Sequence, residues 1–544
     1  MPLVNLDQTA FSDGDPESKI CIIGESPTSI EVRLQKPFMG PAGTVLDQCL
    51  HAAGIIRRQC YFVTVFPEQV KKNARTGEIK NMDGEVLWNV KGGFSDAGKV
   101  AAYGCIEKVA KSGANVIVPL GSTALSLFSS ERSILKWRGS ILTANNGRKM
   151  VPTIHPAAAL RGQYLYRHLI THDLRRVRDE STDPEVNLPK RSYIIDPTFD
   201  QVIEYLAMCC KQPKIATDIE VFNHQVSCIS FAPSPHEAIC VPFLAPGMKH
   251  RWTEEQETEI WLLIAQILGD PAIMKINQNI SFDIGFLLQQ NNIITRGPLG
   301  DTMIAQHIVY PDFKKGLDMV ASIHTREPYW KDDGKLWSKP WVDWEQFWIY
   351  NSKDSAVAFD AWNELEKELD DGYRWSYDAT MRLLPPVVYM MTRGMLVDKE
   401  ELRATSERVT AELEAKYAEL KEVAEWEFNP KSPKQCQEYF YVTKNIKPYV
   451  NRSTGRVTTD DKAMARIVNR YNLREARLVQ EIRGLEKLRG TYLEVGIDKD
   501  SRIRCSYNLR GTTTGRLSSS QTVFGNGMNM QNLHPEFKSF IVSE

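Results

Sequence analysis

The chain has 544 residues, of which 42% are hydrophobic and 25% charged, with a formal net charge of -1. This length exceeds what one hydrophobic core supports, so we predict several domains, and the composition excludes a chain that is disordered as a whole. No apolar run is long enough for a membrane span, and the first 15 residues lack the basic start and apolar centre of a signal peptide, which predicts an intracellular protein without a membrane partner.

Ten cysteines are scattered along the chain without a C-x-x-C pair. The adjacent Cys209 and Cys210 cannot form an unstrained bridge with each other. We therefore predict reduced thiols, as in a cytosol, and no functional cysteine.

The first third of the sequence predicts a parallel sheet with helices on its faces. Short apolar runs alternate with helix-like stretches such as "GTVLDQCLHAAGI" and "DAGKVAAYGCIEKVAKSG"; the runs occupy residues 19–26, 60–66, 115–121 and 150–156. This β-α-β rhythm is typical of a doubly wound sheet. A polar, Pro-bearing segment at 179–192 predicts a boundary, and we place the domain at residues 1–185.

The same region resembles the uracil-DNA glycosylase superfamily over about residues 19–173. The resemblance rests on "CIIGESPTSIEVRLQKPFMGPAGTVLDQCLHAAGI", "VIVPLGSTAL" and "TIHPAAALRG". It implies a pocket for a flipped base, formed by Gly24, Glu25, Ser26, Pro27 and His155.

Two departures from that family affect the expected activity. Thr28 stands where the family has a glycine, and Val65 where it has the asparagine that recognises uracil. Without that amide the pocket loses its hydrogen bonds to the pyrimidine edge, so we expect a non-catalytic domain that serves DNA binding or assembly. The family's cysteine pattern is also not reproduced, and no iron-sulfur cluster is expected.

The middle third, which we place at residues 191–375, predicts a second α/β domain that carries a set of acids. In "KIATDIEVF", Asp218 and Glu220 are two residues apart on a strand, so both point to the same face. "NQNISFDIGFL" supplies Asp283, and "IYNSKDSAV" supplies Tyr350 and Asp354 one helical turn apart. Hard divalent ions are bound by oxygen ligands of this type.

This series resembles the DEDDy class of proofreading 3'-5' exonucleases, found in family A DNA polymerases, and "GDTMIAQHIVYP" matches a connecting segment of that family. The resemblance implies a ribonuclease H-like fold and two divalent metal ions, Mg²⁺ or Mn²⁺, held by Asp218, Glu220, Asp283 and Asp354. One ion would activate water and the other would stabilise the leaving 3'-oxygen, while Tyr350 orients the water. The implied substrates are single-stranded or frayed 3' ends of DNA.

The last third changes to a helical pattern. Residues 399–427 and 474–496 carry apolar residues at helical spacing amid charges, which predicts two long helices packed side by side. From Lys431 to Arg516 there are 19 Lys and Arg against 9 Asp and Glu, an excess expected of a surface that follows a phosphate backbone. The charge alone fits a solvated helix face equally well.

The motifs "FNPKSPKQCQEYF", "TGRVTTDD", "LEKLRGTY" and "TTTGRLSSS" with "MNMQNL" resemble, in this order, the thumb and the opening of the palm of family A DNA polymerases. The resemblance covers residues 382–544, with a thumb region at 376–500 and the beginning of the palm at 501–544. It implies that primer-template DNA contacts Lys487, Thr491, Tyr492, Thr514, Gly515, Arg516, Asn529 and Gln531. Arg516 can pair with phosphate, and the amides can reach minor-groove acceptors. A pair of charged helices that contacts a protein is the alternative.

The sequence ends at "FKSFIVSE", before the metal-binding palm aspartate and the fingers helix of that family. Nucleotidyl transfer needs those carboxylates, so we expect no polymerisation by this chain alone. Two explanations of this end stay open: a truncated polypeptide, or a polymerase that is split between two chains. The sheet edge and apolar face that such an end would leave unpaired favour a second chain with palm and fingers.

The sequence thus predicts a multidomain α/β protein: the N-terminal part of a family A replicative DNA polymerase with metal-dependent proofreading activity. Its domain combination resembles certain bacteriophage polymerases, which predicts action in the cytoplasm, that of the host if the protein is viral. Two alternatives remain. One is a DNA-binding scaffold subunit whose exonuclease is idle, and the other is a base-excision repair enzyme that uses the N-terminal pocket.

Overall fold

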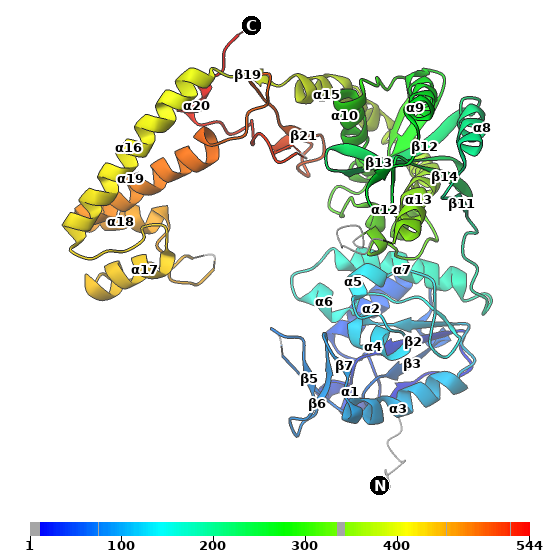
Figure 1. Ribbon diagram of the computed structural model, residues 1–544. Helices are drawn as coiled ribbons and strands as arrows, with labels where there is room; N and C mark the ends of the chain where they lie inside the picture. Colours follow the sequence, from blue (N-terminus) through cyan, green and yellow to red (C-terminus); the bar gives the residue numbers. More distant parts are fainter. Residues whose placement is uncertain (1–10, 74, 335–342, 453, 523, 544) are drawn as a thin grey trace. The chain divides into compact units, whose positions relative to one another are not determined.

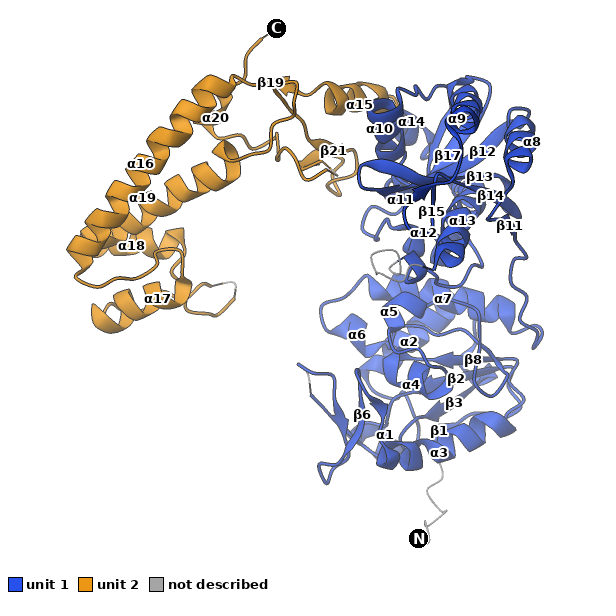
Figure 2. Cartoon of the chain, viewed as in Figure 1, with its two compact units in different colours: residues 1–381 blue, residues 382–544 orange. Residues whose placement is uncertain are grey.

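The computed structural model describes residues 11–73, 75–334, 343–452, 454–522 and 524–543. The chain divides between Met381 and Arg382 into two compact units, each described here by itself (Figure 2). Residues 1–10, part of the segment used to predict the absence of a signal peptide, lie outside the described residues. None of the described helices is long and apolar enough to cross a membrane. All ten cysteines lie within the described ranges as free thiols, nine of them buried.

Unit 1 begins with a six-stranded sheet in the order β1-β3-β2-β8-β10-β9. The four central strands are parallel, as predicted, and both edge strands are antiparallel to their neighbours. The strands are β1 (Ser12–Asp13), β2 (Ile20–Gly24), β3 (Cys60–Thr64), β8 (Val116–Pro119), β9 (Leu142–Thr143) and β10 (Lys149–Met150).

Helices cover both faces of this sheet because its central strands β2 and β8 are apolar on both sides. In β2, Ile20 and Ile22 pack in one cluster with α2 and α7, while Cys21 and Ile23 pack in another with α3 and α4. This alternation is the period of a strand. The helices are α1 (Ser29–Leu34), α2 (Pro41–Ala52), α3 (Asp96–Lys111), α4 (Gly121–Phe128), α5 (Ile134–Trp137), α6 (Ala157–Leu160) and α7 (Tyr166–Glu180).

Two local features differ from the sequence prediction. The strand predicted at 150–156 is limited to Met150 and an isolated bridge from Thr153 to Leu120, because the prolines at 152 and 156 cannot donate to a ladder. A separate four-stranded antiparallel sheet, for which we predicted no strands, follows β3. It comprises β4 (Lys71–Lys72), β5 (Ile79–Lys80), β6 (Val86–Asn89) and β7 (Gly93–Phe94).

The second sheet of unit 1 has the order β11-β14-β13-β12-β17-β18. Strands β12, β13 and β14 form an antiparallel meander, and β17 and β18 continue from β12 in parallel. The strands are β11 (Ser192–Ile194), β12 (Lys214–Phe222), β13 (Gln225–Ser234), β14 (Glu237–Pro242), β17 (Met274–Asn277) and β18 (Leu299–Asp301). A small hairpin is formed by β15 (Leu244–Ala245) and β16 (Lys249–His250).

The long helix α13 (Trp344–Asp370) packs across β12, β13 and β14 (Figure 1). The other helices of this sheet are α8 (Phe199–Cys209), α9 (Glu254–Gly269), α10 (Ile280–Asn291), α11 (Thr302–Val309), α12 (Leu317–His324) and α14 (Arg374–Met381). The arrangement leaves the faces of β12 and α13 opposite each other, and both carry predicted site residues.

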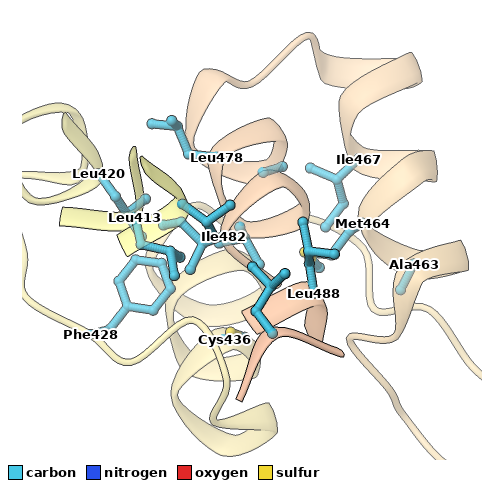
Figure 3. Packing of buried hydrophobic residues seen from close by; sticks show 14 of the residues in the cluster. Leu413, Leu420, Phe428, Cys436, Ala463, Met464, Ile467, Leu478, Ile482 and Leu488 are labelled. Carbon is cyan, nitrogen blue, oxygen red and sulfur yellow. The ribbon is translucent and has the colours of Figure 1, made fainter. Parts of the chain in front are cut away.

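Unit 2 contains the two long helices that the sequence predicts, α16 (Lys399–Ala424) and α19 (Arg474–Leu488), which lie side by side (Figure 1). Figure 3 shows Leu413 and Leu420 of α16 beside Ile482 of α19 in one buried cluster. Both helices are shorter than predicted, since α16 ends at Ala424 and α19 gives way to a π-helical turn at Arg489.

The remaining elements of unit 2 are short. The helices are α15 (Leu384–Arg393), α17 (Pro433–Gln437), η3 (Glu438–Thr443), α18 (Asp461–Tyr471), η4 (Arg489–Leu493) and α20 (Pro535–Lys538). The strands are β19 (Met395–Leu396), β20 (Arg502–Ile503), β21 (Ser506–Asn508) and β22 (Ser518–Ser520).

Candidate functional site

Three acids predicted from two distant segments meet in unit 1. Asp218 and Glu220 lie on β12, and Asp354 lies on α13. One carboxylate oxygen from each lies within 4.8 Å of the others. Such a group of oxygen donors fits a hard divalent cation.

Asp283, the fourth predicted acid, sits in the first turn of α10 and is buried. Its Oδ1 accepts a hydrogen bond from the backbone N–H of Ile219, the residue between Asp218 and Glu220 (3.1 Å). The structure thus places Asp283 against the same stretch of β12, although the group of three carboxylates that meet within 4.8 Å does not include it.

Tyr350 and Asp354 lie one turn apart on α13 and share a partner that the sequence did not predict. Lys331 Nζ donates to the Tyr350 hydroxyl (2.6 Å) and forms an ion pair with Oδ2 of Asp354. Trp330 Nε1 donates to the other oxygen of Asp354, Oδ1 (2.7 Å). Both carboxylate oxygens of Asp354 are therefore held by neighbouring residues of one loop.

The acids of this site lie close enough to repel one another, and the pKa values of three of them are raised. Burial, followed by repulsion from Asp354, raises the pKa of Asp218 well above its usual range and that of Glu220 to about 8. Burial likewise raises the pKa of Asp283 to about 7. Burial alone would lower the pKa of Lys331, but the charge and hydrogen bond of Asp354 together with the charges of Asp218 and Glu220 outweigh burial, and the pKa is raised. A divalent cation would relieve this repulsion.

A further residue orients the first acid. Asn351, which is fully buried next to Tyr350 in the sequence, donates through Nδ2 to Oδ2 of Asp218 (2.8 Å) and to its backbone carbonyl (3.1 Å). Sequence analysis missed Asn351, Trp330 and Lys331. The position of Asn351 beside Tyr350 on a helix facing the strand was an available signal, whereas nothing local marks Trp330 or Lys331.

The five predicted pocket residues of the N-terminal domain lie near the carboxyl ends of β2 and β8. Gly24 ends β2, and a Cβ at that position would lie 2.6 Å from the ring of Phe38. The ring centroid of His155 lies 6.2 Å from that of Phe38. Burial lowers the pKa of His155, and its Nδ1 accepts a hydrogen bond from the backbone N–H of Ala157 (3.2 Å).

The carboxylate of Glu25 has two partners that sequence analysis missed. Its Oε2 accepts from Lys72 Nζ (2.6 Å) and from Thr123 Oγ1 (2.8 Å). Burial alone would raise the pKa of Glu25, but the charges of Lys72 and His155 and the hydrogen bonds from Lys72 and Thr123 together outweigh burial, and the pKa is lowered. Lys72 belongs to β4 of the sheet for which no strands were predicted. The fully buried Val65 packs in the apolar cluster of Ile23, on the face opposite Phe38.

The eight residues predicted to contact DNA all lie in unit 2, where hydrogen bonds connect their segments. The Tyr492 hydroxyl donates to the carbonyl of Asn532 (2.9 Å), which joins η4 to residues 529–534. Gln531 Nε2 donates to the carbonyl of Leu517 (2.9 Å), and Ser519 Oγ donates to Asn529 Oδ1 (2.8 Å). Seven of the eight are exposed and Tyr492 is half-buried; the seven are Lys487, Thr491, Thr514, Gly515, Arg516, Asn529 and Gln531.

Comparison with known proteins finds two families along the chain. Residues 11–175 match the uracil DNA glycosylase superfamily, and residues 399–541 match DNA polymerase family A. The chain thus carries one region similar to each family, and we call residues 11–175 the glycosylase-superfamily domain. In both cases the match falls where the sequence motifs predicted it.

Three curated relatives illustrate the similarity. The DNA polymerase I of Pseudomonas aeruginosa is 26% identical over 58% of this chain and 36% of the relative. The type-4 uracil-DNA glycosylase of Thermotoga maritima is 28% identical over 32% of this chain and 79% of the relative. The DNA polymerase of Bacillus phage SP01 is 21% identical over 93% of this chain and 62% of the relative. The chain thus spans about a third of the Pseudomonas polymerase.

The acid group lies between the two matched regions of the chain. The glycosylase-superfamily domain holds Glu25 and His155, and the polymerase region holds the eight predicted DNA contacts. The functional assignment of the acids therefore rests on their own geometry.

Proposed function

We propose that residues 191–375 form a DEDDy-class 3'-5' exonuclease domain with a ribonuclease H-like fold, in a chain related to family A replicative DNA polymerases. The observation that carries the proposal is the meeting of Asp218, Glu220 and Asp354 within 4.8 Å, with Asp283 bonded to the same strand. The meander β12-β13-β14 with β17 and β18 in parallel beside β12 supports the fold assignment.

In this proposal the four acids Asp218, Glu220, Asp283 and Asp354 hold two divalent metal ions, Mg²⁺ or Mn²⁺. Such ions supply a water of lowered pKa and offset negative charge on the phosphate and the leaving 3'-oxygen. Tyr350 orients the attacking water through its hydroxyl. Lys331 fixes that hydroxyl by donating to it, and Asn351 fixes the carboxylate of Asp218.

A digestion experiment tests the proposal. The purified chain is incubated with Mg²⁺ and a 5'-labelled primer-template whose 3' end is mismatched, beside Asp218→Ala. We expect a ladder of shortened primers with the native chain and none with the variant. An uncut primer with folded, DNA-binding protein would contradict the assignment and favour the scaffold alternative.

We further propose that residues 376–500 and 501–544 bind primer-template DNA as a thumb and the start of a palm. The family A match, the hydrogen bond from Gln531 to Leu517 beside the exposed residues 514–516, and the excess of basic residues support this. Fluorescence anisotropy with labelled duplex tests it, and binding that does not depend on salt would contradict it. No comparison supports the second chain with palm and fingers, which stays a prediction. The expectation that this chain does not polymerise DNA by itself also stays a prediction.

For the N-terminal domain at residues 1–185 we propose a non-catalytic role. The engagement of Glu25 by Lys72 and Thr123 favours this, since that carboxylate already has two partners within the protein. Incubation with uracil-containing DNA followed by alkali tests it, and strand cleavage that depends on His155 would support the repair-enzyme alternative instead.

A further inference from the structure

Four consecutive residues between α12 and α13 contact two different sites. The outer two residues contact one site, and the inner two contact the other. We call residues 329–332 the bridge segment. Tyr329 and Asp332 contact the glycosylase-superfamily domain, whereas Trp330 and Lys331 contact the acid group.

The contacts to the glycosylase-superfamily domain come from α5 and the residues after it. Lys136 Nζ donates to both carboxylate oxygens of Asp332 (2.7 and 2.9 Å). The rings of Trp137 and Tyr329 pack edge to face with centroids 5.3 Å apart. The backbone N–H of Tyr329 donates to Ser140 Oγ (3.2 Å). These contacts fix both ends of the bridge segment.

The contacts to the acid group are those that orient Asp354. Trp330 is buried and donates to Oδ1, and Lys331 pairs with Oδ2 while donating to Tyr350. The bridge segment contacts both carboxylate oxygens of Asp354. The position of the bridge segment therefore sets the orientation of this carboxylate toward Asp218 and Glu220.

A buried ion pair anchors the chain just before the bridge segment. Arg138 and Asp173, both almost fully buried, pair within the glycosylase-superfamily domain. Arg138 also donates to Ser322 Oγ of α12 (2.9 Å), and Arg176 donates to the carbonyl of Thr325 (2.6 Å). Separating these surfaces would leave buried charges with unmet hydrogen bonds, so α12 and the bridge segment are held firmly on the domain.

We propose that the glycosylase-superfamily domain positions the exonuclease acids through the bridge segment, and that Trp330 and Lys331 are positioning residues for Asp354 and Tyr350. This inference rests on the proposed exonuclease function. It gives the N-terminal domain a role that does not require the excision of a DNA base. A displacement of about 1 Å at a reacting group can lower a rate by about a hundredfold, so a contact remote from the acids can affect the rate.

A charge exchange across the interface tests the coupling. Lys136→Glu and Asp332→Lys are made singly and together, and exonuclease kcat and KM are measured on the mismatched primer-template. Each single variant should lower kcat about tenfold with little change in KM, and the double variant should recover most of the loss, because the ion pair is restored with reversed sign. The matched control is the same exchange at the exposed pair Asp96 and Lys99 of α3, which should leave kcat unchanged.

Two further measurements separate positioning from unfolding and from failure of the proposed function. Amide hydrogen exchange of peptides spanning 328–333, without metal or DNA, should become faster in each single variant and return to the native rate in the double variant. Lys331→Gln should lower kcat yet still bind Mn²⁺, followed by electron paramagnetic resonance, because it removes a positive charge and no carboxylate.

The outcomes are distinct. If the native chain cuts DNA and the single variants match it in both kcat and exchange, the coupling is wrong and the exonuclease stands. If the native chain neither cuts DNA nor binds Mn²⁺ at the acids, the proposed function is wrong and the inference falls with it.

Discussion

Replacing Asp218 by Asn should stabilise unit 1 when metal is absent while abolishing exonuclease activity. A carboxylate oxygen of Asp218 lies within 4.8 Å of one carboxylate oxygen of Glu220 and one of Asp354. Two unit charges at that separation repel by about 3.5 kcal/mol at an effective dielectric constant of about 20. Asp218 faces two such charges, but Lys331 neutralises most of the charge on Asp354. The repulsion from Glu220 then dominates, so we expect a net gain of about 3 kcal/mol. The Asn351 amide retains an acceptor, because the Asn oxygen can take its hydrogen bond.

The dependence on pH has a definite sign. Burial and mutual repulsion raise the folded-state pKa values of these acids, that of Glu220 to about 8 and that of Asp283 to about 7. A raised carboxyl pKa means that the folded state binds more protons than the unfolded state, so metal-free stability falls as pH rises from about 4 to about 8. The advantage of Asp218→Asn should therefore be large at pH 8 and small at pH 5.

Thermal unfolding in EDTA at both pH values measures the effect. For the proposed exonuclease domain at residues 191–375, a gain of about 3 kcal/mol corresponds to a rise in Tm of about 6–12 °C. Mn²⁺ should raise the Tm of the native chain more than that of the variant. The control Asp96→Asn, at an exposed carboxylate on α3, should change Tm little. A variant no more stable than the native chain in EDTA at pH 8 would refute the reasoning.

Three more outcomes follow from packing and charge. Arg138→Ala should destabilise unit 1 by about 3–5 kcal/mol in thermal unfolding, because it leaves Asp173 buried without its partner, and an unchanged Tm would contradict this. Ile482→Ala, in the fully buried contact of α19 with α16, should cost unit 2 about 2–5 kcal/mol, with the exposed Lys462→Ala of α18 as control. Arg516→Ala should weaken duplex binding and reduce the slope of log K against log salt by about 1, measured by anisotropy; an unaltered slope would exclude a phosphate contact.

Predictions from the sequence were most accurate where the residues concerned lie within one strand or one helix. The alternation in "KIATDIEVF" placed Asp218 and Glu220 on one face of β12, and the i, i+4 spacing placed Tyr350 and Asp354 on one side of α13. Helical periodicity predicted α16 and α19 within a turn of their starts, although both ended early. It overestimated the strand at 150–156, where two prolines prevent pairing.

What the sequence determined by itself was the two family regions, the strands and helices with strong periodicity, and the identity of the acids, since each depends on residues within one short segment. Only the tertiary structure decided which side chains complete each site. Lys331 reaches Asp354 across 23 positions, Lys72 reaches Glu25 across 47, and Lys136 reaches Asp332 across 196. No local pattern encodes such pairs, because the chain brings them together only when the sheets and helices pack.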